Sequence, residues 1–276
     1  MTNRHLIALC ALALCATAHA ETSISDANNE FSFMLGARYQ LYEEMDNYNQ
    51  VPSKYLDSET GYEPTVQIGV SRQGTLFGLK NIYTEADVSL SAGRSDYSGY
   101  ELAPAPPHNP GQPLTESKTG VTADVHLKLG RSFPLVGGRI QETPYLVYGY
   151  HRWARDSIET YSNHELGVGL LSQYSPTEKL VLGLDISVSR IFAAEVQTHH
   201  GVDEDLGSRY SPSATLRADY AITKRSHLVA SWQVDRFAYG QSANVTGVYA
   251  GMQGTWYEPT SRTFQQTWLV GYAYSF

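Results

Sequence analysis

The last ten residues of the chain, Thr267-Trp268-Leu269-Val270-Gly271-Tyr272-Ala273-Tyr274-Ser275-Phe276, decide the fold. Aromatic or apolar side chains stand at every second position from Trp268 to Phe276, and the positions between them are mostly small, such as Gly271 and Ala273. Successive side chains of a β-strand point to opposite faces, so this spacing predicts a strand with one bulky apolar face.

The same two-residue period recurs along the chain. It is clearest in Leu180–Ser189, where one face carries Leu180, Leu182, Leu184, Ile186 and Val188 and the other Val181, Gly183, Asp185, Ser187 and Ser189. We expect about ten such strands, near 31–43, 63–73, 82–97, 119–133, 143–155, 163–174, 179–192, 211–222, 226–237 and 263–276. Each is long enough to cross a bilayer when tilted, which takes roughly 9–11 residues.

The connections between these strands alternate in length. Those near 74–81, 134–142, 175–178 and 223–225 are short, whereas those near 44–62, 98–118, 156–162, 193–210 and 238–262 are mostly long and polar. Short turns at one end and long loops at the other are typical of outer-membrane barrels. The pattern predicts an all-β fold, a closed antiparallel up-and-down transmembrane β-barrel. A secreted β-sandwich, the alternative, would have strands of about five or six residues.

The N-terminus has the layout of a secretory signal peptide. Arg4 is followed by an apolar stretch from Leu6 to Thr17, and Ala18-His19-Ala20 fits a cleavage site with Ala18 and Ala20 as its small residues. We therefore expect residues 1–20 to be removed and 21–276 to form one barrel domain without cysteine. The whole chain has a net charge of −8, and the loss of Arg4 makes the mature charge close to −9. This charge argues against a nucleic-acid partner.

The C-terminal residues Phe276, Tyr274, Tyr272 and Val270 resemble the end of bacterial outer-membrane β-barrel proteins, which close on an aromatic residue with alternating apolar positions before it. The resemblance implies export to the outer membrane and contact with its lipid and lipopolysaccharide. It also implies that periplasmic chaperones and the barrel-assembly machinery are partners, with these four residues as the assembly signal.

The alternation also separates a lipid-facing set from a lumen-facing set. Aromatic residues expected outside, as interfacial girdles, are Tyr39, Phe133, Tyr148, Tyr150, Tyr174, Tyr220, Trp232 and Phe276. The polar network expected inside comprises Arg38, Glu85, Asp87, Asp124, His126, Lys128, Glu165, Asp185, Arg217, Asp219 and Asp235, and the same faces carry His151, Arg155 and His227.

A barrel of about ten strands has a narrow bore, because eight strands are just filled by side chains and open channels need sixteen or more. We therefore expect the inward charges to pair as a structural core, with Asp87 opposite Lys128 as one cross-strand pair. A narrow conduit remains the alternative.

Two short motifs are similar to the omptin proteases, a ten-stranded family that activates water with an acidic pair and an Asp-His pair at the outer rim. They are Glu85-Ala86-Asp87 and Asp124-Val125-His126. They depart from the family in place, since Glu85 lies near the periplasmic end of its strand and the Asp-x-His motif lies in the fourth strand.

The loop residues His199, His200, Asp203, Glu204 and Asp205 have side chains that can bind metal, but adjacent residues rarely share one ion, so a solvated acidic loop is expected.

The sequence displays no Ser-His-Asp grouping, phosphate loop or cofactor fingerprint, and no cofactor is predicted. Three functions follow, in order of preference. The first is surface binding of an extracellular ligand, or a structural role, through the long loops. The second is a narrow porin-like channel for ions or small solutes. The third is an omptin-like hydrolase.

Overall fold

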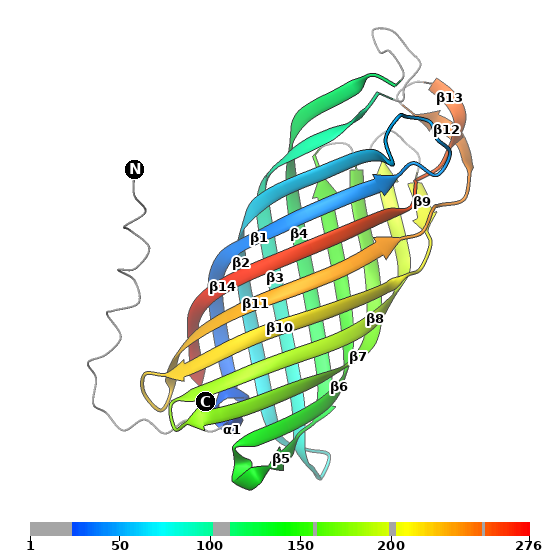
Figure 1. The fold of residues 1–276 in the computed structure, drawn as a ribbon. Coiled ribbons are helices and arrows are strands. Elements are labelled where there is room, and N and C mark those ends of the chain that lie inside the picture. The colour runs from blue at the N-terminus through cyan, green and yellow to red at the C-terminus, as the bar shows by residue number, and fades with distance from the viewer. Residues whose placement is uncertain (1–23, 102–110, 157–158, 199–202, 250–251) are drawn as a thin grey trace, which may run out of the picture.

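The computed structural model describes residues 24–101, 111–156, 159–198, 203–249 and 252–276. Ten antiparallel strands form a closed ring (Figure 1). They are β1 (Glu30–Met45), β2 (Tyr55–Leu76), β3 (Leu79–Tyr100), β4 (Pro113–Arg131), β6 (Ile140–Arg155), β7 (Glu159–Thr177), β8 (Leu180–Thr198), β10 (Tyr210–Ala221), β11 (Ser226–Tyr239) and β14 (Ser261–Ser275). The ring closes where β1 pairs with β14.

Six smaller elements lie at the two ends of this ring. α1 (Ile24–Ala27), β5 (Phe133–Leu135) and the 3-10 turn Val136–Gly138 lie at the end that carries the C-terminus, while β9 (Asp203–Leu206), β12 (Val245–Tyr249) and β13 (Met252–Trp256) lie at the opposite end (Figure 1). No helix in the described ranges is long and apolar enough to span a membrane.

The outer surface of the barrel is apolar, as the alternation predicts. Leu184 and Ile186 are 40% and 53% exposed, and Val270 and Phe276 of the C-terminal segment are 66% and 62% exposed. The inward neighbours of these residues are buried or half-buried, and except for Leu269 they are polar or small. An outward apolar face around a closed sheet is the arrangement that hydrocarbon requires, because every backbone group of the wall is then hydrogen-bonded within the ring.

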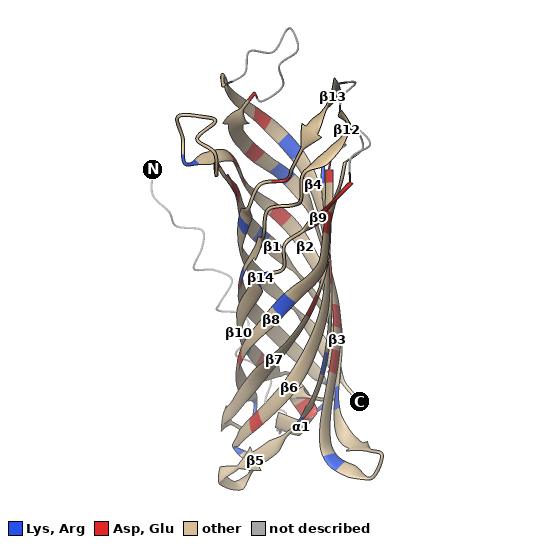
Figure 2. Cartoon of the chain, turned by 90° about the vertical axis from the view of Figure 1, so that its right-hand side faces the viewer, with Lys and Arg blue, Asp and Glu red and all other residues tan. Residues whose placement is uncertain are grey.

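All ten predicted strands are confirmed, but their outer ends extend further than expected. β2 begins at Tyr55 rather than near 63, β3 continues to Tyr100, and parts of two predicted loops form β9 and the β12–β13 hairpin. The inner connections are short, for example 178–179 and 222–225. The barrel wall therefore rises into a tall outer rim, on which acidic and basic residues are interspersed (Figure 2).

Candidate functional site

The barrel interior is built from stacked layers of charged and aromatic side chains. In the middle layer, Asp124 of β4 accepts hydrogen bonds from Arg38 Nη2 at 2.5 Å and from Ser89 Oγ at 3.2 Å, and its other oxygen lies 2.6 Å from His151 Nδ1. Arg38 and Asp124 are 5% and 7% exposed. A charge this deeply enclosed is stable only when paired, so these side chains act as a unit.

One predicted pair in the next layer is wrong. Asp87 stands opposite His126 rather than Lys128, and Lys128 stands opposite Glu85. His126 Nδ1 lies 3.3 Å from Asp87, and its Nε2 lies 3.6 Å from Glu165. The error is a slip of two residues, which keeps every side chain on its own face. A long connection such as that between β3 and β4 does not fix register as a tight turn does.

Lys128 is the centre of a third layer. Its ammonium group donates to Glu85 at 2.8 Å and to Asp185 at 2.7 Å. The hydroxyl groups of Tyr83 and Tyr145 donate to these two carboxylates, Tyr83 to Glu85 and Tyr145 to Asp185. The two carboxylates are thereby bridged by one cation, and each also accepts a hydrogen bond from a tyrosine hydroxyl. Together these groups form a polar network across the bore in which each carboxylate has donors.

The remaining predicted lumen residues also lie inside. Arg217 forms an ion pair with Glu30 near the inner end, and Asp235 accepts hydrogen bonds from the side-chain amide of Gln233 at 2.9 and 3.0 Å. Asp219 is 2% exposed and lies 2.6 Å from His227 Nδ1. The eleven residues are thus brought into separate layers along the bore and not into one cluster.

A Ser-His-Asp grouping exists, contrary to the sequence analysis. His227 Nε2 lies 3.3 Å from Ser275 Oγ, and Asp219 faces the other ring nitrogen. Such groupings have no fixed order in sequence, so the spacing of 219, 227 and 275 carries no signal. Ser275 donates its proton to the Asp26 carbonyl at 3.0 Å and His227 is fully buried, so the geometry does not present a nucleophile to a substrate.

The inner mouth is filled by α1, which no sequence pattern predicted. Ile24 and Ala27 pack on Val181 inside the barrel. Immediately after α1, Asn28 joins a ring of side-chain amides that spans the bore: Asn28 donates to Gln73 at 2.8 Å and to Gln173 at 2.9 Å, and Gln141 donates to both glutamines at 2.9 and 3.2 Å.

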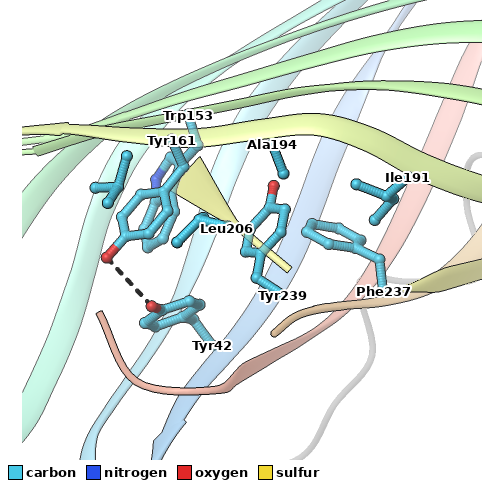
Figure 3. Packing of buried hydrophobic residues seen from close by; sticks show 9 residues of the cluster. Tyr42, Trp153, Tyr161, Ile191, Ala194, Leu206, Phe237 and Tyr239 are labelled. Carbon is cyan, nitrogen blue, oxygen red and sulfur yellow. Dashed lines mark hydrogen bonds between the residues drawn. The ribbon is translucent and has the colours of Figure 1, made fainter. Parts of the chain in front are cut away.

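The outer part of the bore is filled by a buried aromatic cluster, Tyr42, Trp153, Tyr161, Ile191, Ala194, Val196, Leu206, Phe237 and Tyr239 (Figure 3). Trp153 and Tyr161 stack with ring centroids 5.4 Å apart, and the Tyr42 and Tyr161 hydroxyls are 3.3 Å apart. These rings come from β1, β6, β7 and β11, so the cluster reaches across the bore from several sides.

Arg155 sits above this cluster and ties together four carboxylates. It donates to Glu59 at 2.7 Å, Asp57 at 2.9 Å, Glu159 at 3.2 Å and Glu44 at 3.3 Å. The sequence pattern predicts Arg155 on the inward face, but its acidic partners Glu44, Asp57 and Glu59 fall in the predicted 44–62 connection. The signal was present, because Asp57, Glu59 and Glu63 alternate with the outward positions of β2.

The rim loops above Arg155 are held to one another. Gln50 donates to the Tyr257 hydroxyl at 2.6 Å, Gln241 donates to the Tyr48 hydroxyl at 2.9 Å, and the rings of Tyr48 and Tyr257 meet edge to face. Tyr48 nevertheless remains 59% exposed. The connection after β1 and the segments that flank the β12–β13 hairpin therefore form one ordered surface.

The predicted solvated acidic loop is wrong for Glu204. This residue is buried in β9 and accepts hydrogen bonds from the Glu258 backbone amide at 2.5 Å and from the Ser242 hydroxyl. Its carboxylate therefore links β9 by a hydrogen bond to the segment before β14. Asp203 and Asp205 are exposed, and His199 and His200 lie outside the described residues.

Two neighbouring cavities that share lining residues lie between α1 and the aromatic cluster. Their volumes are about 140 and 50 Å³, and both are lined by Asp87, His126, Glu165 and Asp235. A polar cavity of this size has room for several water molecules. The omptin-like motifs therefore border an internal hollow in the barrel and do not stand at its rim.

Glu258 gives the rim a predicted pH dependence. Its burial, and then the nearby Glu44 and Glu159, raise its pKa well above the ordinary value of 4.5. A raised carboxyl pKa adds stability below the ordinary value that is lost as the pH rises toward the folded-state value. Glu258→Gln, which keeps an acceptor for Tyr161, is expected to stabilise the rim at neutral pH by about 1 kcal/mol and to flatten this dependence.

Hydrogen exchange of the 252–276 region at pH 5 and pH 8 measures this effect. Asp203→Asn, which removes an exposed carboxylate from the same end of the barrel, is the control and should leave the difference between the two pH values intact. An equal difference in wild type and Glu258→Gln would contradict the assignment to Glu258.

The sequence matches no protein-family model and no curated protein. Among solved structures, the outer-membrane protease OmpT from Escherichia coli is similar at 11% identity and a TM-score of 0.59, over 94% of this chain and 99% of that chain. The translocator domain of autotransporter NalP from Neisseria meningitidis matches at 12% identity and a TM-score of 0.39, over 94% and 90%. The attachment invasion locus protein Ail of Yersinia pestis matches at 11% and 0.29, over 90% and 99%.

At identities of 11–12% such matches concern the fold alone, and only the OmpT match, with its TM-score of 0.59, bears on the fold of this chain. This likeness in fold agrees with the closed antiparallel ring of ten strands. The chain therefore has the fold of the bacterial outer-membrane β-barrels, and its lipid-facing surface places it in that membrane.

Proposed function

We propose that this protein is a non-conducting surface barrel that binds an extracellular ligand through its outer rim. The observation that carries the proposal is the filling of the bore at both ends by ordered, mutually bonded side chains. A conduit needs a continuous water path, whereas here the side-chain amide layer lies on the inner side of the internal cavities and the aromatic cluster lies on their outer side.

The inner barrier supports this role because it is made by side chains that satisfy one another. Four side-chain amides, from Asn28 just after α1 and from β2, β6 and β7, are linked by hydrogen bonds of 2.8–3.2 Å. An ion crossing this layer would have to break several of these bonds, and each broken bond leaves an enclosed polar group without a partner.

The outer barrier supports this role because the aromatic rings and the ion-pair cluster around Arg155 occupy adjoining levels of the bore. Tyr42, Trp153 and Tyr161 are at most 3% exposed, and the Arg155 guanidinium lies 5.1 Å from the Tyr42 ring centroid. Cation–π contacts in an enclosed site are stabilising, so the contact between Arg155 and the aromatic rings opposes opening of this layer.

The rim itself has the properties of a binding surface. Its loops are ordered by contacts between Tyr48, Gln50 and Tyr257, which lowers the entropy cost of binding. Tyr48 and Val248 are 59% and 52% exposed there, and tyrosine is enriched among residues that dominate binding energy. The ligand is therefore expected to contact the loop 46–54 and the β12–β13 hairpin.

Planar-bilayer recording tests the closed bore. The wild-type barrel is expected to give no single-channel steps. Deletion of 24–28, which removes α1 and Asn28, should stay silent because the outer barrier remains, and so should Tyr42→Ala with Tyr161→Ala, because the inner barrier remains. The combination of both changes should conduct, because it opens both barriers at once.

Folding of each variant is checked by the heat-dependent shift in gel mobility of a closed barrel. Stable steps from the wild type would overturn the proposal and favour the narrow channel. Silence of a correctly folded combined variant would show that further layers block the bore, for example the bridge at Lys128.

A further inference from the structure

Three potential metal-binding side chains meet at the inner end of the barrel, next to the seam where the ring closes. Glu30 comes from β1, Asp219 from β10 and His227 from β11. Each offers one donor atom, and these atoms all lie within 4.8 Å of one another. Glu30 and Asp219 are 2% exposed and His227 is fully buried.

The hydrogen bonds around His227 fix which ring nitrogen carries the proton. Ser275 Oγ lies 3.0 Å from the Asp26 carbonyl oxygen and 3.3 Å from His227 Nε2. A carbonyl oxygen only accepts, so the single hydroxyl proton of Ser275 points there. Ser275 must then accept from Nε2, which places the proton of the neutral ring on Nε2 and leaves a lone pair on Nδ1.

That lone pair faces a carboxylate. His227 Nδ1 lies 2.6 Å from Asp219 Oδ1, and with the proton on Nε2 both atoms are acceptors. Two acceptors at this distance repel unless a positive centre, either a proton or a metal ion, lies between them or beside both.

The carboxylates show the same deficit independently. Arg217 binds Oε1 of Glu30, but Glu30 Oε2 and Asp219 Oδ2 are buried and, among the described residues, have no hydrogen-bond partner. Leaving two carboxylate oxygens enclosed without a donor is costly. The nearby guanidinium compensates one of the two negative charges and leaves the other.

We propose that Glu30, Asp219 and His227 bind a divalent metal ion of the zinc class at the inner mouth of the barrel. One imidazole nitrogen and two carboxylate oxygens are a ligand set that Zn²⁺ accepts, with the unprotonated Nδ1 as the nitrogen ligand. Arg217 on Glu30 and Ser275 on His227 are then outer partners that orient the ligands, as metal sites commonly have.

The site joins strands that are far apart in the chain but adjacent at the seam. β1 pairs with β14, and β14 pairs with β11, which pairs with β10. A bound ion would therefore link both sides of the closing β1–β14 pair. Because a metal that binds only the folded state adds its binding free energy to stability, the ion would stabilise the closed ring.

The test uses the full mature chain folded in detergent micelles, stripped with EDTA and titrated with ZnCl₂ by calorimetry. We expect one ion per barrel and a higher thermal midpoint with zinc. Co²⁺ in place of zinc is expected to show the visible absorption of a low-coordinate site with a nitrogen ligand. Asp219→Asn and His227→Gln should weaken binding at least 100-fold, and Ser275→Ala by about 10–100-fold.

His151→Gln is the matched control, because His151 also lies 2.6 Å from an aspartate, Asp124, but at a place where Arg38 supplies the positive charge. It should leave zinc binding unchanged. The proposal fails if the folded wild type takes up less than one zinc per barrel without a shift in thermal midpoint, since protons then fill the deficit. It also fails if Asp219→Asn, His227→Gln and Ser275→Ala bind zinc as tightly as the His151→Gln control.

If the two ligand variants do not fold, the wild-type stoichiometry, the Co²⁺ spectrum and Ser275→Ala decide the outcome. A spectrum typical of six oxygen ligands would overturn the assignment of His227 as a ligand even if an ion binds.

Discussion

Arg155→Met is expected to lower the free energy of unfolding by about 3–5 kcal/mol, the usual loss when one partner of a buried ion-pair network is removed. Arg155 is 6% exposed, and its guanidinium donates to four carboxylates within 3.3 Å. Without it, these groups repel one another in an enclosed space, and the aromatic cluster below loses the cation that covers the Tyr42 ring.

Urea titration of the refolded barrel in detergent, followed by tryptophan fluorescence, measures this loss. Part of the lost stability should return at lower pH, because protonation of the carboxylates relieves their repulsion. Arg262→Met is the control: Arg262 pairs with Glu43 at 2.6 Å but its side chain is 35% exposed, so its loss should cost about 0–1 kcal/mol. Equal losses for the two variants would mean that the rim cluster is not an enclosed network.

Asp124→Ala is the second change with a large expected effect, again about 3–5 kcal/mol. Asp124 is the carboxylate that pairs with Arg38 and contacts His151. Within the described part of the chain, two other guanidinium nitrogens of Arg38, Nε and Nη1, already have no hydrogen-bond partner. Removal of the aspartate leaves a buried cation in the middle of the bore.

A double-mutant cycle separates this pairing from a simple loss of packing. Arg38→Met combined with Asp124→Ala should be less destabilised than the sum of the two single variants by roughly 1–3 kcal/mol, because neither charge is then left alone. Additive effects would show that the two side chains contribute separately, and the layered description of the lumen would have to be abandoned at this level.

The wall of the barrel was predictable from sequence because the pattern of inward and outward residues can be recognised within a single strand. Lipid on one side and a polar bore on the other impose a period of two, and Leu180–Ser189 displays it without interruption. The outer strand ends were missed because their inward residues, such as Asp57 and Glu59, are acidic and resemble a loop unless their cation, Arg155, is known to lie opposite them.

The candidate sites were less predictable because they depend on register and on distant partners. Asp87 and Lys128 lie on the expected face but two positions out of register. Ser275, His227 and Asp219 meet only after the ring closes, and α1 is a single turn whose position depends on contacts with Val181 and the amide layer. No short sequence window contains this information.

The inner plug also has a kinetic consequence. Asn28 bonds to Gln73 of β2 and to Gln173 of β7, strands that stand on different sides of the completed ring. These bonds cannot form until the wall is complete, so they contribute little to the rate-limiting step of assembly and act mainly by slowing dissociation of the finished structure. The first residues of the described chain are thus among the last to reach their place, and they lengthen the lifetime of the assembled protein.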